Sequence, residues 1–239
     1  MDKNRRICID RFVDMPLSYS KQGMKILSSL NTDELAMLPS KRWPKRKINI
    51  KFLEGTSYQR EMVQNYVLEL MNYANINLNF VPMDEYADIR IAFNENLGSW
   101  SYVGVDSLSV SNQNEPTLNL GWITESEPEL SKKNTIQHEM LHALGFYHEQ
   151  SREYSDIRWN KEKVIEDLAG PPNRWTPEQV EHNVFRRYSA DISAFSEFDP
   201  NSIMIYPIPA EWTLDGRSFG FEKNGLTEID KSFFRNMYP

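Results

Sequence analysis

The feature that most constrains this chain is a run of residues that fits H-E-x-x-H-x-x-G-x-x-H, beginning at His138. On a helix, His138 and His142 project from one face one turn apart, so their imidazoles can hold a single zinc ion. Gly145 allows a sharp turn after that helix, which can bring His148 back as a third nitrogen ligand. Three protein ligands leave one position for water, as a catalytic zinc requires, and Glu139 lies beside that position.

This run is too specific to be attributed to chance. The short H-E-x-x-H pattern needs supporting context, but average residue usage gives the extended pattern a chance frequency on the order of 10⁻⁵ in a chain of this length. Three of the four histidines in the chain fill its positions. The fourth, His182, is expected to be an ordinary surface or packed side chain.

Hydrophobic periodicity predicts an alternation of strands and helices before the histidine run. Apolar and polar residues alternate in segments that predict strands at 47–52, 76–80, 88–93 and 118–122. Helical spacing predicts one helix over 58–74 and another from about 131 to 144. The order strand, helix, strand indicates a right-handed crossover and a partly parallel sheet.

Turn and capping signals organise the other segments. Glycines bracket the aromatic run 98–104, which predicts a loop or an edge strand, and residues 24–38 could form a short helix. Toward the C-terminus, three residues are expected to cap the starts of helices: Asn160, Thr176 and Thr227.

Composition limits the class of protein. The chain is 40% apolar and 26% charged, as globular proteins are, and it lacks the stretch of about 18 apolar residues that a membrane span needs. A net charge of −7 makes a broad basic face for nucleic acid unexpected. Residues 1–20 lack the apolar core of a secretory signal. The single cysteine, Cys8, excludes a disulfide within the chain.

These features together resemble the metzincin metalloendopeptidases, and most of all their astacin branch. Besides the histidine run, the resemblance is carried by Glu149 directly after the third histidine and by Ser202-Ile203-Met204-Ile205-Tyr206-Pro207, which is similar to the Met-turn S-x-M-x-Y. Weaker matches are Arg42-Trp43-Pro44 and the run 98–104. The resemblance covers roughly residues 41 to 210.

The resemblance implies an α+β, metzincin-like protease fold of two subdomains. Residues 1–40 would be an N-terminal extension or a propeptide. Residues 41–148 would form a catalytic subdomain with a twisted, mostly parallel sheet and long helices, including the zinc helix. Residues 149–239 would form an irregular catalytic subdomain with the Met-turn and a final helix. The basic run 41–47, at the first boundary, is a solvated linker or a processing site.

The implied function is that of a zinc metalloendopeptidase, which hydrolyses internal peptide bonds. Zn²⁺ would be bound by three imidazoles, those of His138, His142 and His148. Glu139 would act as the general base toward a zinc-activated water. Tyr206 would be a switchable fifth ligand that turns away to donate a hydrogen bond to the oxyanion.

Other residues receive roles from the resemblance that compete with ordinary ones. Met204 would lie beneath the metal or be a normal core methionine. Glu149 would contact the new N-terminus of the mature enzyme or be a solvated glutamate. The substrate would extend along residues 99–112, where Trp100 and Tyr102 would line the cleft or pack within the sheet.

Some features depart from the astacin branch. Its disulfides cannot form here, and its F-x-G-D propeptide motif is matched only by Phe12-Val13-Asp14, which lacks the glycine. Cys8 could place a thiolate on zinc, as in related matrix metalloproteinases, or be an ordinary buried cysteine. Alternative functions are therefore a non-proteolytic zinc-binding module or a latent protease blocked by its N-terminal segment. The intact Glu139 favours an enzyme, because a pure zinc binder needs no base.

We expect a protein or peptide as the substrate, no nucleic acid as a partner, no membrane span and a monomeric state. Analogy with the family favours action outside the producing cell, although the sequence contains no signal peptide.

Overall fold

The computed structural model describes residues 7–11, 39–152, 155–171, 173–188 and 197–239. The predicted helix over 24–38 and the sequence Phe12-Val13-Asp14 lie outside these residues. Among the described residues, no helix combines the length and the apolar character needed to cross a membrane.

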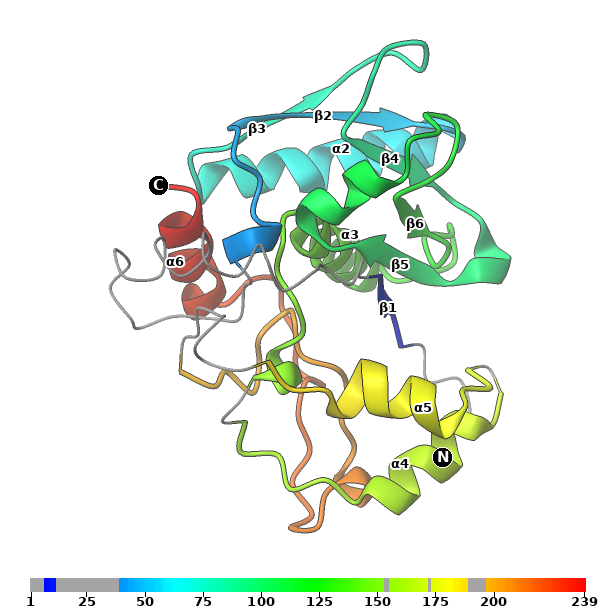
Figure 1. Cartoon of the computed structure of the whole chain (residues 1–239), viewed down its shortest axis with the longest axis vertical. Coiled ribbons are helices and arrows are strands. Elements are labelled where there is room, and N and C mark those ends of the chain that lie inside the picture. Colours follow the sequence, from blue (N-terminus) through cyan, green and yellow to red (C-terminus); the bar gives the residue numbers. More distant parts are fainter. Residues whose placement is uncertain (1–6, 12–38, 153–154, 172, 189–196) are drawn as a thin grey trace.

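The upper half of the molecule in Figure 1 is built on a six-stranded sheet with the order β1-β5-β6-β4-β2-β3. The strands are β1 (Ile9–Arg11), β2 (Lys47–Phe52), β3 (Asn77–Phe80), β4 (Ile89–Ala92), β5 (Ser99–Tyr102) and β6 (Leu118–Leu120). All neighbouring pairs are parallel except β5 and β6, which are antiparallel. The expected α+β fold with a mostly parallel sheet is therefore present.

Apart from the helix over 24–38, which lies outside the described residues, the predicted strands and helices are present; β2 has the predicted bounds and the others have shifted ends. The helices are α2 (Ser57–Glu69), α3 (Glu129–Ala143), α4 (Lys161–Ala169), α5 (Pro177–Val180) and α6 (Glu228–Met237). Helix α2 is shorter than the range 58–74, because its last residues tighten into the 3₁₀ turn Leu70–Asn72. Strand β6 ends before Gly121, where a side chain would meet the carbonyl oxygens of Asn94 and Gly98.

Capping signals located the helix starts well. Asn160 caps α4 through its side chain, and Thr176 and Thr227 form capping boxes at the starts of α5 and α6. The aromatic run 98–104 contains β5, which lies between β6 and the N-terminal strand β1. The run therefore contains a strand, but the predicted edge position is wrong, because β1 pairs with its outer side.

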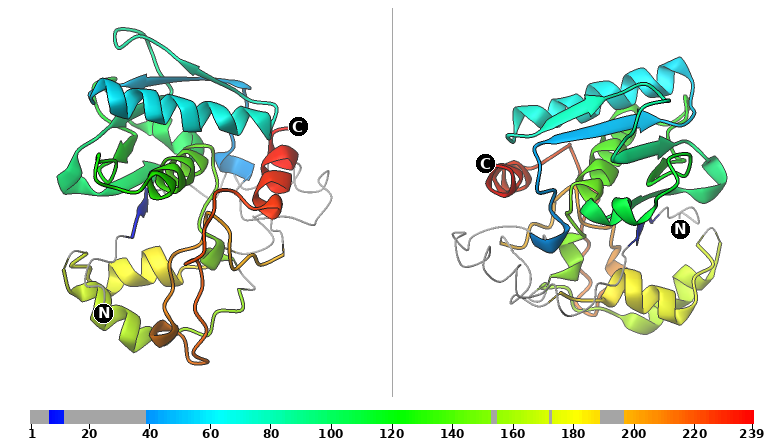
Figure 2. Two further views of the ribbon diagram at one scale, coloured as in Figure 1. Left: turned by 180° about the vertical axis from the view of Figure 1, so that it is seen from behind. Right: turned by 45° about the horizontal axis from the view of Figure 1, so that its top comes forward.

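Two buried hydrophobic clusters meet at the centre of the molecule. The first joins the sheet, α2, α3 and α6, and the second joins α4 and α5 to the loops in the lower half of Figure 1. Residues 202–207, which we call the Met-turn segment, connect them. Ile203 and Met204 belong to the first cluster, and Ile205 and Tyr206 belong to the second. Seen from behind in Figure 2, α3 lies beside α2.

Candidate metal centre

The end of α3 turns the chain back on itself. Gly145 has a φ of 103°, in the left-handed region that favours glycine. Its N–H donates to the carbonyl of His142 at 2.8 Å, and the N–H of Phe146 donates to that of Leu141 at 3.0 Å. These two bonds form the Schellman arrangement, which satisfies the last carbonyl groups of the helix. The glycine bend predicted from the sequence is therefore observed.

The turn brings the three histidines of the motif together. The Nε2 atoms of His138, His142 and His148 lie 3.0, 3.1 and 3.2 Å from one another. Ligands placed 2.0–2.1 Å from one tetrahedral zinc ion would be roughly 3.3 Å apart. All three side chains are buried, His142 and His148 completely. The three nitrogens therefore have the spacing that a single zinc ion requires.

Two backbone carbonyls fix the orientation of the imidazoles. His138 Nδ1 lies 2.7 Å from the oxygen of Ile203, and His142 Nδ1 lies 2.8 Å from that of Phe146. Donation from Nδ1 leaves the Nε2 lone pair for a metal. Burial, with added repulsion from the two other histidines, holds the pKa of His138 well below its usual value. The neutral imidazole that binds metals is thereby favoured.

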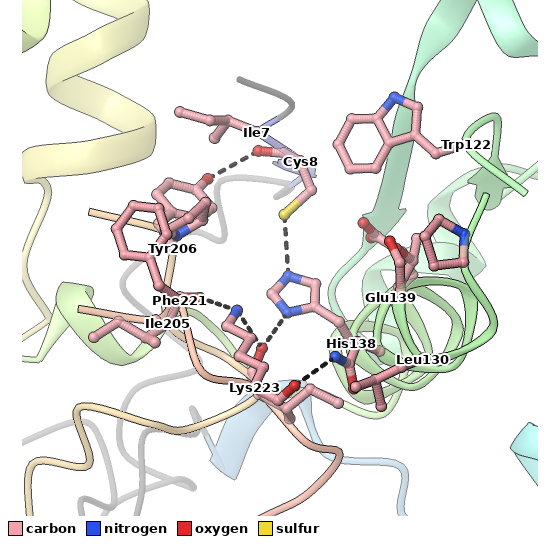
Figure 3. A pocket seen from close by; sticks show the side chains of 17 residues that line it. Ile7, Cys8, Trp122, Leu130, His138, Glu139, Ile205, Tyr206, Phe221 and Lys223 are labelled. Carbon is pink, nitrogen blue, oxygen red and sulfur yellow. Dashed lines mark hydrogen bonds between the residues drawn. The ribbon is translucent and has the colours of Figure 1, made fainter. Parts of the chain in front are cut away.

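Cys8 reaches this cluster from the N-terminal segment. Its sulfur lies 3.1 Å from His138 Nε2, 3.0 Å from His148 Nε2 and 3.9 Å from His142 Nε2. All four donor atoms lie within 4.8 Å of one another, in a group that could hold a metal ion. Three imidazole nitrogens and one thiol sulfur fit a tetrahedral zinc site. Cys8 is buried, as an ordinary core cysteine would be. Its sulfur also lies next to the histidine nitrogens, where a thiolate ligand of zinc would be expected (Figure 3).

Glu139 and Tyr206 lie on opposite sides of Cys8 in Figure 3. Glu139 is buried and lines the same cavity as His138. The Tyr206 hydroxyl donates to the carbonyl oxygen of Cys8 at 2.8 Å, and its ring centre lies 4.0 Å from that of His148. The two predicted catalytic side chains thus flank the histidine cluster.

The Met-turn segment is held by groups that sequence reasoning did not identify. Asp230, at the start of α6, accepts hydrogen bonds from the Ser202 hydroxyl at 2.7 Å and the Ile203 N–H at 3.0 Å. Burial raises the pKa of Asp230. Gln150 accepts from the N–H of Tyr206 at 3.2 Å. Only its position two residues after His148 could have drawn attention to Gln150.

Glu149 is fully buried, so it is not the solvated glutamate that one alternative expected. One carboxylate oxygen accepts from Arg152 at 2.9 Å and from the N–H of Asp199 at 3.1 Å. Burial raises the pKa of Glu149 to about 7.

A cavity of about 450 Å³ opens beside the histidines. Trp122 and Leu130 line one side of it in Figure 3, and Phe221 and Lys223 line the other. These residues were not singled out from the sequence, because none belongs to a recognisable motif.

Trp100 and Tyr102 are not among the residues that line this cavity. Trp100 is buried under the guanidinium of Arg11, which lies 3.5 Å from its ring centre. His182 is exposed on the surface, as expected.

Comparisons with known proteins agree with this geometry. A family model described as Astacin, a peptidase family, matches residues 36–210. A solved structure of myroilysin superposes with a TM-score of 0.81 at 38% identity, covering 85% of this chain and 98% of that chain. High choriolytic enzyme 1, a hatching-enzyme zinc-protease from Oryzias latipes, has a TM-score of 0.58 over 87% of this chain and 98% of its own. At 19% identity this likeness shows the fold alone.

A curated relative, zinc metalloproteinase dpy-31 of Caenorhabditis elegans, is 32% identical over 170 residues, which are 66% of this chain and 26% of the relative. The chain thus spans about a quarter of the length of the curated relatives that it matches. The resemblance and the fold class predicted from the sequence are confirmed, and zinc is the metal that this family uses. With most of its sequence matched and its fold shared, the chain belongs to the astacin family of peptidases, whose members are zinc metalloendopeptidases.

Proposed function

We propose that this chain hydrolyses internal peptide bonds of protein substrates, with zinc held by three histidines: His138, His142 and His148. The observation that carries the proposal is the convergence of their Nε2 atoms within 3.2 Å beside a cavity that Glu139 also lines. By analogy with the family, the activity would operate outside the producing cell.

In this proposal the chain's own residues move the protons and stabilise the charge. When bound, zinc would polarise the substrate carbonyl and lower the pKa of water. Glu139 accepts a proton from the attacking water and then delivers it to the departing amine. The Tyr206 hydroxyl donates to the oxyanion. Its present bond to the Cys8 carbonyl supports this role, because a backbone carbonyl is already within its reach.

We also propose that the full chain is latent until its N-terminal segment is removed. The Cys8 sulfur lies 3.0 and 3.1 Å from two of the histidine nitrogens, where a fourth zinc ligand would be expected. The Tyr206 hydroxyl donates its hydrogen bond to the Cys8 carbonyl. The strand β1, which follows Cys8, is paired with β5. The thiolate would therefore exclude the catalytic water.

The central experiment compares the wild-type chain with Glu139→Gln. Casein hydrolysis is measured before and after limited proteolysis of residues 1–38, with and without a chelator, and zinc content is measured on the same samples. We expect Glu139→Gln to keep zinc and to lose about 10²–10⁴-fold in activity. Glu129→Gln, on the exposed first turn of the same helix, is the matched control and should retain activity.

Two outcomes would contradict the proposal. Full activity of Glu139→Gln would remove Glu139 as the base. A processed wild-type chain that holds zinc but cleaves nothing would favour a zinc-binding module instead.

A further inference from the structure

Lys223 lies in the loop between the Met-turn segment and α6, and it lines the cavity beside the histidines (Figure 3). Its ammonium group donates to the carbonyl oxygen of Ile203 at 3.0 Å and also to that of Ile205. These two carbonyls lie on either side of Met204. The lysine therefore fixes the backbone of the Met-turn segment at its centre.

One of those carbonyls also orients a histidine. The Ile203 oxygen lies 2.7 Å from His138 Nδ1, so it accepts from the imidazole and from Lys223 together. The direction of this oxygen determines where the imidazole ring points and which ring nitrogen carries the proton. A substitution of Lys223 would thus change the orientation of His138 through the Ile203 oxygen that both side chains contact.

The loop that carries Lys223 is tied to the histidine helix itself. The Asn134 side chain donates to the carbonyl of Lys223 at 3.2 Å and accepts from the N–H of Gly225 at 3.0 Å. Asn134 precedes His138 by four residues, so both lie on one face of α3. The contacts form a closed circuit from α3 to Lys223, to Ile203, to His138 and back to α3.

We propose that Lys223 is a positioning residue for the metal, which sets the orientation of His138 through the Ile203 carbonyl. The inference rests on the proposed function, since it requires His138 to bind zinc. Hydrogen-bond partners of metal-binding histidines typically contribute about 10–100-fold to metal affinity. Lys223 therefore affects how tightly the chain holds zinc, independently of any contact with substrate.

The test measures zinc affinity by competition with a chromophoric chelator on the full chain, and the visible spectrum of the Co²⁺-loaded chain. Lys223→Met removes the donors while keeping most of the side-chain length, and Lys223→Arg restores them. Because Lys223 acts through the Ile203 carbonyl, the lower end of this range applies, and we expect Lys223→Met to bind zinc about 10-fold more weakly with an altered cobalt spectrum. Lys223→Arg should recover most of that loss.

The matched control is Lys51→Met. Lys51 is a buried lysine that also donates to two carbonyls, those of Met83 at 3.1 Å and Glu85 at 3.0 Å. It lies on β2, and neither of its acceptors belongs to the Met-turn segment or to α3. Its replacement should destabilise the fold in a similar way while leaving zinc affinity and the cobalt spectrum unchanged.

The outcomes separate this inference from the proposed function. If the wild-type chain binds no zinc, the proposed function fails first. If the wild-type chain binds zinc and Lys223→Met binds it equally well, or if Lys51→Met loses as much affinity, the role of Lys223 is rejected while the histidine site stands. If Lys223→Met does not fold, the variant Asn134→Ala tests the inference instead, because it removes the bonds that hold the loop of Lys223 to α3. Weaker zinc binding by Asn134→Ala would support the role of Lys223, and unchanged zinc binding would overturn it.

Discussion

Three side chains around the candidate metal centre make a further contact that limits how far they can turn. His138 and His142 bond to backbone carbonyls, and Tyr206 bonds to the carbonyl of Cys8. These side chains therefore lose their conformational entropy when the chain folds, and binding of a metal or a substrate does not have to order them again. The free-energy cost of ordering the site is thus met when α3 and the Met-turn segment fold.

Replacing Tyr206 with phenylalanine tests its role at this scale. The variant keeps the ring next to His148 but lacks the oxyanion donor, so we expect kcat to fall by about 10²-fold or more, with zinc content unchanged. The measurement is the steady-state rate after removal of the N-terminal segment. Tyr73→Phe, whose hydroxyl bonds to Glu69 in α2, is the control. An unchanged kcat would reduce Tyr206 to a packing role.

At this scale the spacing of residues in the sequence related local groups only. Cys8 was offered as a zinc ligand by family resemblance alone, and Asp230 was not identified. The histidines and Glu139 lie within eleven residues, so helix geometry and the turn at Gly145 are enough to relate them. Cys8 reaches His138 across 130 positions, and Asp230 reaches Ser202 across 28. No periodicity connects residues so far apart, and only the folded chain brings them together.

At the scale of elements, the short strand β1 positions one of the side chains of the site. This three-residue strand pairs in parallel with β5, with Ile9 opposite Trp100 and Arg11 opposite Tyr102. The pairing places Cys8, the residue before the strand, at the histidine nitrogens. The short strand therefore determines the position of the sulfur.

Removing the sulfur tests the latency that we propose. A serine hydroxyl is a far weaker zinc ligand than a thiolate, so Cys8→Ser should allow the full chain to hydrolyse casein without prior proteolysis. We expect at least about a tenfold rise in rate, which corresponds to about 1.4 kcal/mol. Ile7→Val, at the adjacent position that also lines the cavity, serves as the control. Equal rates in wild type and Cys8→Ser would argue against a blocking thiolate.

Helix starts were more predictable than helix ends. Capping by Thr176 and Thr227 depends on residues within one turn, so the local sequence is sufficient. Helix α5, by contrast, ends after four residues and continues as the π-helix Glu181–Phe185. Val184 and Phe185 of this π-helix are buried in the second hydrophobic cluster, so the transition depends on contacts with residues far away in the sequence.

For the whole molecule, the candidate metal centre lies where the two hydrophobic clusters meet. Helix α3 belongs to the first cluster, and Cys8 and Tyr206 belong to the second. An ion bound between them should stabilise both halves against unfolding. Removing zinc with a chelator should therefore lower the melting temperature, and adding zinc back should restore it.

The size of this effect follows from binding linkage. Zinc at about 1,000 times its Kd stabilises a folded chain by about 4 kcal/mol, which corresponds to a melting shift of about 8–16 °C for a protein of this size. Scanning calorimetry of the full chain with and without chelator measures it. A melting temperature insensitive to zinc would mean that the ion does not connect the halves.

The anchoring of residues 41–43 restricts where the chain can be trimmed. Lys41 is buried and bonds to Asp106 at 2.7 Å, and the indole of Trp43 donates to the carbonyl of Ala143 at the end of α3 at 2.8 Å. A cut after Trp43, within the rest of the basic run 41–47, would separate this tryptophan from the part of the chain that contains α3. If the N-terminal segment is removed as we propose, a cut ahead of Lys41 would leave Trp43 bonded to the end of α3 in the shortened protein.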